Sequence, residues 1–423
     1  MTSAMHSRPD TGPAPVQLAF GNQVYDRALA LAEQGKDANQ IAKVLCDQDL
    51  EGYNYGIGVI LGGDGKPAAT SSTLLEYTVA ELQRCDRGGY ANSAVLMEEV
   101  KQAALAWQRV PGEYWDRFTL ALPSDAGTGA VMSAVEAALI LSPGLDTLGV
   151  EELGWPAYKT IARVVRVQYR EHPEDAVIGG EGVLPVYQSG PMNTTGRVWG
   201  PEVIRSRAEA AAQSGVPVVL DRAYAGFEFA RLLASHGYDE VMRRSYELQL
   251  RPFIETGARF CLAASPTKAF VTFSLRPSGL LLVYEPDAAR RNEVANVLGA
   301  IIRARGSSFE HPVTRAFAKA MAQDLVRFEG EHAESMRRVA DAEEQWRALV
   351  RATPIEPLFS EEYAGLFRNP QARKGAAARI YDQHIYPVFS GDRCRQNVTG
   401  IPEDEELARK HVAVFAAECF QST

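Results

Sequence analysis

The feature that most constrains the fold of this chain is an alternation of apolar, strand-like segments with amphipathic, helix-like segments between about residues 70 and 290. Strands are expected at 118–122, 149–153, 164–169, 183–188, 216–220, 260–264 and 280–284, and helices at 95–107, 130–141, 201–214 and after Trp155-Pro156. Strands that alternate with helices are typical of a mostly parallel sheet with helices on both faces. The sequence therefore predicts an α/β fold.

The segments on either side of this alternation predict a second, smaller domain. Helical periodicity occurs at 21–50 and at about 313–350, and the chain closes with an amphipathic segment at 404–420. A chain of 423 residues is long enough for one large domain and a smaller one. We predict a flexible N-terminal tail at 1–20, a large domain at 69–335, and a small α+β domain built from 21–68 together with 336–423.

Composition excludes several classes of function. The formal net charge is -9 and no basic stripe is present, which argues against a nucleic-acid or anionic-membrane surface. No apolar run approaches the roughly 20 residues of a membrane span. The five cysteines lack C-x-x-C spacing and the seven histidines form no metal-binding pattern, so we expect neither a disulfide framework nor a metal site. These observations favour a cytoplasmic protein that acts on small molecules.

Lys268 is the residue on which the functional interpretation depends. It follows the apolar strand pattern at 260–264 and a Ser265-Pro266 break, at the edge of the expected core, where neighbouring groups can lower the pKa of an amine. Ser265 and Arg276, on either side of it, can bind an anion. An amine beside an anion site suits pyridoxal phosphate, because the amine condenses with the aldehyde while the other groups hold the phosphate. Taken alone, a lysine after a strand is more often a solvated loop residue.

Two further segments lie where strand patterns end. Gly127 and Thr128 lie in a turn before a helix, and free N–H groups at a helix N-terminus bind phosphate. A plain turn or a dinucleotide site also fits this segment, although G-x-G-x-x-G is absent. Asp221 ends a buried strand at the sheet edge where α/β proteins bind ligands, and a carboxylate there can keep a pyridine nitrogen protonated. A helix-capping aspartate is the alternative.

An asparagine and an arginine near the C-terminus complete the set of candidate residues. Asn193 lies in the turn after the preceding strand, where its amide can donate a hydrogen bond to a ring hydroxyl. Arg395 lies in a short β-like run, and its planar fork matches the carboxylate of an α-amino acid. A plain turn and a surface arginine are the corresponding alternatives.

Taken together, these residues follow the order and spacing of the fold-type I aminotransferases. From about residue 50 to its end, the chain most closely resembles the aspartate/aromatic amino acid aminotransferase family. The segments that carry the resemblance are Asn54–Val59 (N-L-G-I-G-V in the family), Gly154–Lys159 (S-W-P-N-H-K), Asn193–Gly196 (N-P-T-G), Asp221–Phe227 (D-F-A-Y-Q-G-F), Ser265–Lys268 (S-x-x-K) and Arg395–Gly400 (R-x-N-V-A-G).

The resemblance implies a homodimeric aminotransferase with pyridoxal phosphate as its cofactor. Lys268 would bind the cofactor covalently and then act as general base, and Asp221 would keep the ring nitrogen protonated. The other cofactor-binding residues that the resemblance implies are Gly127, Thr128, Ser265, Arg276 and the neighbouring subunit's Tyr90 at the phosphate, Trp155 on the ring face, and Asn193 and Tyr224 at the ring oxygen. For the substrate it implies Gly58, Trp155, Asn193 and Arg395, with Arg303 reaching a distal carboxylate in the neighbouring subunit.

Departures from the family pattern leave the substrate open. Ala126 replaces a phosphate-binding serine, Tyr158 replaces the histidine behind Asp221, and Thr194 replaces a proline. We expect 2-oxoglutarate as acceptor and aspartate or an aromatic amino acid as donor, although a less common donor and a role for Arg305 in place of Arg303 stay open. A β-lyase, decarboxylase or oxidase with the same cofactor is the first alternative. A non-catalytic regulator is the second, although no DNA-binding module precedes residue 50.

Overall fold

The expected alternation of strands and helices folds into a seven-stranded sheet with the order β2-β8-β7-β6-β5-β3-β4. The computed structural model describes residues 22–62, 65–84, 93–119, 122–271, 275, 279–306 and 311–421, so the predicted tail lies outside the described residues. The sheet strands are β2 (Leu122–Ser124), β3 (Thr147–Glu151), β4 (Gln168–His172), β5 (Val183–Gln188), β6 (Val218–Arg222), β7 (Phe260–Ala264) and β8 (Gly279–Tyr284). Strands β3 to β7 are parallel and only β8 runs against its neighbours, which confirms the mostly parallel α/β sheet.

Helices cover both faces of the sheet. On β6, Val219 belongs to one buried apolar cluster whereas Val218 and Leu220 belong to another, because successive side chains of a strand point to opposite faces. The helices of this part of the chain are α4 (Ser93–Trp107), α5 (Ala126–Leu141), α6 (Ala157–Val165), α7 (Pro201–Ser214), α8 (Leu233–Gln249), α9 (Arg251–Glu255), α10 (Pro266–Ala269) and α11 (Arg291–Gly306). Two apolar cores therefore hold the sheet rigid from either side.

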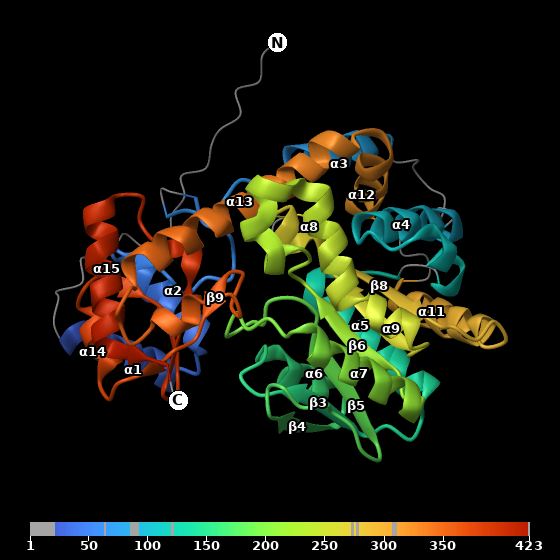
Figure 1. Ribbon diagram of the computed structural model, residues 1–423, viewed down its shortest axis with the longest axis horizontal. Helices are drawn as coiled ribbons and strands as arrows, with labels where there is room; N and C mark the ends of the chain where they lie inside the picture. Colours follow the sequence, from blue (N-terminus) through green and yellow to red (C-terminus); the bar gives the residue numbers. More distant parts are fainter. Residues whose placement is uncertain are drawn as a thin grey trace, which may run out of the picture.

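The two ends of the chain form a second part of the fold. The parallel pairing of Tyr53 with Ile385 joins β1 (Tyr53–Asn54) to β11 (Ile385–Tyr386), and α1 (Asn22–Glu33) and α2 (Ala38–Gln48) lie beside the C-terminal elements (Figure 1). Those elements are β9 (Phe367–Arg368), β10 (Gln371–Ala372), α14 (Ala376–Tyr381), β12 (Val388–Ser390), β13 (Arg393–Asn397), α15 (Glu405–Glu418) and β14 (Cys419–Phe420). The exact division into domains stays a prediction.

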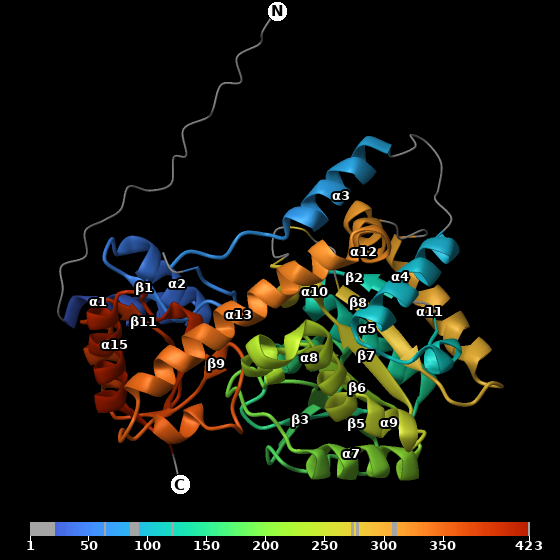
Figure 2. The same cartoon turned by 45° about the horizontal axis from the view of Figure 1, so that its top comes forward.

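Long helices connect the two parts. Helix α13 (Leu325–Leu349) runs from the region of α3 (Ser72–Arg84) and α12 (Pro312–Gln323) to the C-terminal elements (Figures 1 and 2). Short 3-10 turns occur at η1 (Gly112–Arg117), η2 (Phe227–Leu232), η3 (Glu356–Phe359) and η4 (Val398–Gly400). Within the described ranges, no helix is long and apolar enough to cross a membrane.

Two expected elements were placed wrongly. The strand expected at 164–169 is divided, since α6 continues to Val165, Arg166 adopts a left-handed cap with φ 63°, and β4 begins only at Gln168. The single helix expected at 313–350 is two helices separated at Asp324. Both breaks depend on local backbone conformations that many residue types can adopt. Of the strand expected at 118–122, Phe118 forms an antiparallel bridge with Tyr284 and Leu122 begins β2, whereas residues 120–121 lie outside the described residues.

Candidate active site

A cavity with about 600 Å³ of empty space, part of it open to solvent, lies where several parallel strands end. Its walls come from the first turn of α5, the residue pair before α6, the ends of β5 and β6, and the segments that follow β5, β6 and β7. The lining residues are Ala126, Gly127, Thr128, Trp155, Gln188, Asn193, Asp221, Ala223, Tyr224, Ser265, Thr267 and Lys268. Eight residues proposed from the sequence therefore line one cavity. Arg276 and Tyr90 lie outside the described residues.

Lys268 presents its amine to this cavity from the short helix α10. Its Nζ donates a hydrogen bond to the carbonyl oxygen of Gly58 and lies 5.7 Å from the ring centroid of Tyr224. A Cβ atom at Gly58 would stand 3.7 Å from this Nζ and 3.6 Å from the ring of Phe367. A side chain at position 58 would thus narrow the space around the amine.

Asp221 is a buried carboxylate at the end of β6. Burial raises its pKa from 3.8 to about 6, against hydrogen bonds from Tyr158 and the backbone of Ala223 and the charge of Lys268. The Tyr158 hydroxyl donates to Oδ2 at 2.6 Å. In the described part of the chain, no basic side chain forms an ion pair with this carboxylate. A buried anion of this kind suits a cationic N–H group of a ligand.

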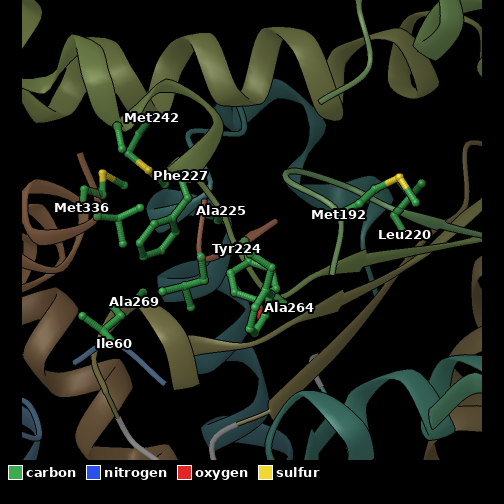
Figure 3. Packing of buried hydrophobic residues seen from close by; sticks show 14 of the residues in the cluster. Ile60, Met192, Leu220, Tyr224, Ala225, Phe227, Met242, Ala264, Ala269 and Met336 are labelled. Atoms are coloured by element: carbon green, nitrogen blue, oxygen red, sulfur yellow. The ribbon is translucent and has the colours of Figure 1, made fainter. Parts of the chain in front are cut away.

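The turn that follows Asp221 is anchored in the core. Figure 3 shows Tyr224, Ala225 and Phe227 beside Met242 and Met336. Burial raises the pKa of Tyr224, while the charge of Arg395 and a hydrogen bond with Asn193 oppose this shift. Tyr224 therefore remains a protonated phenol that can donate a hydrogen bond at neutral pH.

Gln188 holds the backbone of Asn193, whose side chain also takes part in a hydrogen bond with Tyr224. Its N–H donates to Gln188 Oε1 at 2.9 Å, and Gln188 Nε2 donates to its carbonyl oxygen at 2.9 Å. The Asn193 Oδ1 atom is buried and without a hydrogen-bond partner. The next residue, Thr194, donates to Leu153 O at 2.6 Å and accepts from Asn369 Nδ2 at 2.7 Å. This hydroxyl ties the asparagine turn to the C-terminal part of the fold.

The N-terminus of α5 approaches Ser265 closely. A Cβ atom at Gly127 would lie 3.2 Å from Ser265 Oγ, and one at Gly279 would lie 1.8 Å from the carbonyl oxygen of Ala126. Ala126 itself has a φ of 52°, in the left-handed region. The first N–H groups of a helix have no acceptor within it, so this end of α5, together with the Ser265 hydroxyl, is suited to a phosphate. With no hydroxyl at Ala126, the side-chain donors on this side of the cavity, among its described lining residues, are Thr128, Ser265 and Thr267.

Arg395 lies on strand β13, and its charge acts on Tyr224, which follows β6. Its side chain is buried over the Phe367 ring, with 4.6 Å between the guanidinium carbon and the ring centroid, and burial lowers its pKa to about 10. Its Nη2 donates to Asn39 Oδ1 at 2.5 Å and to Gly56 O at 2.7 Å, while its Nε has no hydrogen-bond partner among the described residues. A buried, incompletely bonded guanidinium is suited to a carboxylate.

The two arginines at the end of α11 do not line this cavity in their own chain. Both are exposed. Arg305 donates to Ser133 Oγ at 2.6 Å and pairs with Glu136 on α5. Arg303 forms no ion pair within the described part of the chain. Of the two, Arg303 is therefore the better candidate for binding a distal carboxylate.

Two lining residues were not identified from the sequence. Gln188 ends β5 at the same sheet edge as Asp221, so the edge rule that selected the aspartate would also have selected this glutamine. Thr267 lies between Ser265 and Lys268, and only the helical turn of α10 turns its side chain toward the phosphate side. Among the described residues, no cluster of His, Cys, Asp or Glu could hold a metal ion.

The residues present fit pyridoxal phosphate. The Asp221 carboxylate lines the cavity and forms no ion pair within the described residues, although the charge of Lys268 acts on it. The Asn193 side chain, whose amide N–H can donate, and the Lys268 amine line the same cavity. The first turn of α5 lies beside Ser265, since a Cβ atom at Gly127 would stand 3.2 Å from Ser265 Oγ, so that backbone N–H groups and a hydroxyl meet at the helix end. These four features match the nitrogen, ring oxygen, aldehyde and phosphate of that cofactor.

Comparison with known proteins agrees with this geometry. The family model for aminotransferase class I and II matches residues 124–386. The aromatic-amino-acid aminotransferase from Burkholderia pseudomallei, covalently bound to pyridoxal phosphate, is similar over 90% of this chain and 96% of that chain, with a TM-score of 0.75 and 17% identity.

Two further solved structures have the same fold. The broad specificity aminotransferase from Leishmania mexicana has a TM-score of 0.74 and 17% identity over 90% of this chain and 95% of that chain. The aspartate aminotransferase from Saccharomyces cerevisiae cytoplasm has a TM-score of 0.72 and 18% identity over 90% of this chain and 97% of that chain. A search of curated proteins found no match.

Proposed function

The chain belongs to the aminotransferase class I and II family, and from this premise we propose that it transfers the amino group of an aspartate-type or aromatic L-amino acid to 2-oxoglutarate with pyridoxal phosphate. The observation that carries the proposal is the meeting of Lys268, Asp221 and the α5 N-terminus around one cavity, with Arg395 next to Tyr224. An amine, a ring-nitrogen partner, a phosphate site and a carboxylate site are what this reaction requires.

A substrate panel tests the reaction type and the donor together. The purified protein, loaded with pyridoxal phosphate, is incubated with each L-amino acid and 2-oxoglutarate, and the new keto acid and glutamate are measured. Equal amounts of both products are expected for the preferred donor. Release of carbon dioxide, ammonia or peroxide without glutamate would instead favour the decarboxylase, lyase or oxidase alternatives.

The chemistry of the cofactor and the work of the protein are separate. When bound, pyridoxal phosphate supplies a ring that accepts the electron pair left on the substrate α-carbon. Lys268 would hold this group through its amine. When that amine is free, its Nζ would accept the substrate α-proton and act as the proton donor later in the reaction. Asp221 holds the proton on the ring nitrogen.

Other residues orient the cofactor and the substrate. Trp155 would cover one face of the ring, and the Tyr224 hydroxyl and the Asn193 amide would donate hydrogen bonds to its oxygen. Gly127, Thr128 and Ser265 hold the phosphate. Arg276 joins this group in the proposal, and Gly58 leaves space for the substrate beside Lys268. Arg395 fixes the substrate α-carboxylate, so that the α-hydrogen faces the Lys268 amine.

The substitution Tyr158→Phe is expected to lower activity and to move its acid limit to higher pH. Because the Tyr158 hydrogen bond lowers the pKa of Asp221, its loss raises that pKa further above about 6 and neutralises the carboxylate over a wider range. A hydrogen bond to a charged group contributes about 1.5–3 kcal/mol, so kcat should fall roughly tenfold or more at pH 7. The measurement is kcat between pH 5 and 9.

The matched control for this prediction is Tyr169→Phe, because the Tyr169 hydroxyl donates only to Glu171 on the surface, at 2.8 Å. This control should leave the profile unchanged. An acid limit that does not move in Tyr158→Phe would show that the hydrogen bond does not govern the charge of Asp221.

We further propose a homodimer in the cytoplasm. Leu75, Val79 and Leu82 are exposed on one face of α3, at helical spacing, and an apolar stripe of this kind suits a subunit interface. The family resemblance brings Tyr90 and Arg303 into the neighbouring subunit's site. Sedimentation at micromolar concentration should give twice the chain mass, and an active monomer would contradict the proposed homodimer.

The proposed cytoplasmic location is supported by the cysteines. The structure describes four free thiols, as is usual in a reducing compartment, at Cys46, Cys261, Cys394 and Cys419.

The variant Arg303→Leu is expected to raise KM for 2-oxoglutarate at least about tenfold, with little effect on a monocarboxylic keto acid, because an ion pair in a closed site discriminates strongly. Arg305→Leu is the matched control, since Arg305 already pairs with Glu136. KM values for the two keto acids provide the test. Unchanged selectivity in both variants would mean that α11 does not bind the distal carboxylate.

A further inference from the structure

Asn39 contacts the candidate carboxylate-binding arginine from outside the cavity. It is an exposed residue in the first turn of α2, a helix whose start is fixed by the capping box of Asp37 and Gln40. Its Oδ1 accepts a hydrogen bond from Arg395 Nη2 at 2.5 Å, across 356 positions of sequence. An exposed side chain on a surface helix thus reaches a buried guanidinium.

The pattern of donors on Arg395 makes this contact a competitor for substrate. Nη2 carries two hydrogens, and both have acceptors, Asn39 Oδ1 and Gly56 O. A carboxylate can accept two parallel hydrogen bonds from a guanidinium either from Nη1 and Nη2 or from Nε and Nη2. The remaining pair, Nε and Nη1, is blocked by the arginine's own Cδ atom. Both possible arrangements therefore use Nη2. A carboxylate can therefore form two hydrogen bonds with Arg395 only if Asn39 Oδ1 or Gly56 O first gives up its hydrogen bond with Nη2.

Of the two acceptors, Asn39 is the one that can leave at low cost. Gly56 O belongs to a backbone segment fixed by the Asn54 side chain, whose Oδ1 accepts from Gly56 N at 3.0 Å and from Ile57 N at 2.9 Å. Asn39 has only its side-chain torsions to change, and water can take over its hydrogen bonds. A neutral amide oxygen is also a weaker acceptor for a cation than a carboxylate.

The charge balance favours the exchange. Arg395 is 7% exposed and forms no ion pair within the described part of the chain. The charge of Asp37 acts on it without a direct ion pair. A buried cation in this position gains strongly from an anion that binds it with good geometry. In the substrate-free protein the amide oxygen of Asn39 accepts a hydrogen bond from Arg395 but supplies no negative charge.

We propose that Asn39 is a gate of the carboxylate site, whose amide oxygen occupies an Nη2 hydrogen of Arg395 in the substrate-free protein and yields it to the substrate α-carboxylate. The proposal rests on the proposed role of Arg395. Because donor and acceptor both carry an α-carboxylate, the gate acts on both substrates alike. Asn39 does not touch the reacting atoms, so it changes binding and leaves the chemical step unchanged.

The test measures binding of succinate, a dicarboxylate that cannot react, to the cofactor-loaded protein by titration calorimetry. Asn39→Ala removes the competing acceptor and should lower the Kd about threefold, which is the size expected for one exchanged hydrogen bond. Asn39→Asp supplies a permanent carboxylate to Arg395 and should raise the Kd at least about tenfold. The KM of both substrates should move in the same directions, with kcat within about twofold of wild type.

Controls separate this gate from general effects. Gln34 is an exposed residue just after α1. Like the Asn39 variants, Gln34→Ala shortens the side chain and Gln34→Glu adds a negative charge. Both should leave the Kd for succinate unchanged, which would show that surface charge alone does not alter binding. If Asn39→Ala weakens succinate binding, Asn39 supports Arg395 rather than competing for it, and the gate is rejected. It is rejected equally if both Asn39 variants behave like the Gln34 variants.

A third variant distinguishes failure of the gate from failure of the proposed function. Arg395→Leu should abolish succinate binding. If it does so while the Asn39 variants match wild type, only the gate fails. If Arg395→Leu still binds succinate normally, Arg395 is not the carboxylate ligand, and the substrate side of the proposed function fails with the gate.

Discussion

Replacement of Lys268 by alanine is expected to reduce the transamination rate at least about 10⁴-fold, because the variant loses the covalent link to the cofactor and the general base together. A positioned base alone contributes about 10²–10⁴-fold. No other lysine lines the cavity within the described residues, so no neighbouring amine can substitute. This is the largest single effect that we expect in the chain.

Borohydride reduction gives the direct measurement. The wild-type protein should be yellow, lose its visible band on reduction and carry the label on the peptide with Lys268. Lys268→Ala should still bind the cofactor through Asp221 and the α5 end, yet retain no label after unfolding. Lys159→Ala, an exposed lysine on α6, is the matched control. A label on another residue, or a protein that stays colourless with added cofactor, would reject the assignment.

The second large effect is expected for Asp221. Asp221→Ala should raise the barrier by roughly 3–5 kcal/mol, which is about a 10²–10⁴-fold loss in kcat at about 1.4 kcal/mol per tenfold, because an unprotonated pyridine accepts electrons poorly. The covalent link to Lys268 should persist, so the visible band separates this variant from Lys268→Ala. A kcat near wild type would contradict the role of Asp221.

The same carboxylate should make the cofactor-free protein less stable at neutral pH. Its pKa is raised from 3.8 to about 6 in the fold, so the folded state binds the proton more tightly than the unfolded state. The free energy of unfolding should therefore fall by up to about 3 kcal/mol as pH rises from about 4 to above 6. In Asp221→Asn this loss should be absent, so that the inactive variant is the more stable protein at pH 8. Urea unfolding without cofactor at pH 4.5 and pH 8 measures the difference.

The elements with clear boundary residues could be predicted closely from the sequence. Helix α7 begins at Pro201 and ends before Gly215, which is left-handed with φ 66°, and both residue types favour these positions. Strand β5 matched its expected range because all six of its residues are buried. The end of α6 could not be predicted, since Arg166 takes the conformation that a glycine normally signals and the valines around it resemble a strand.

For the site, the residues that follow strands were predictable, whereas those selected by contacts across the chain were not. Asp221 and Lys268 lie at or just after the ends of apolar strand patterns. A parallel sheet brings the carboxyl ends of its strands to one edge, so these two residues could be placed together without knowledge of the other elements. Asn39 has no local signal, because its contact with Arg395 depends on how the two ends of the chain pack. The bonds of Thr194 to Leu153 and Asn369 are equally invisible until the C-terminal part of the fold is in place.

The way the two ends of the chain meet has a consequence for biosynthesis. Every described lining residue of the cofactor cavity lies between Ala126 and Lys268, so these residues have all left the ribosome long before synthesis ends. The carboxylate site needs Gly56 from the beginning of the chain and Arg395 from near its end. Segments fold as units during synthesis, so the strand ends that carry these residues can form first, while Met336 and Asn369, which hold the turns after Asp221 and Asn193, are still to come. The order of translation thus delays catalytic competence until the last strands are made.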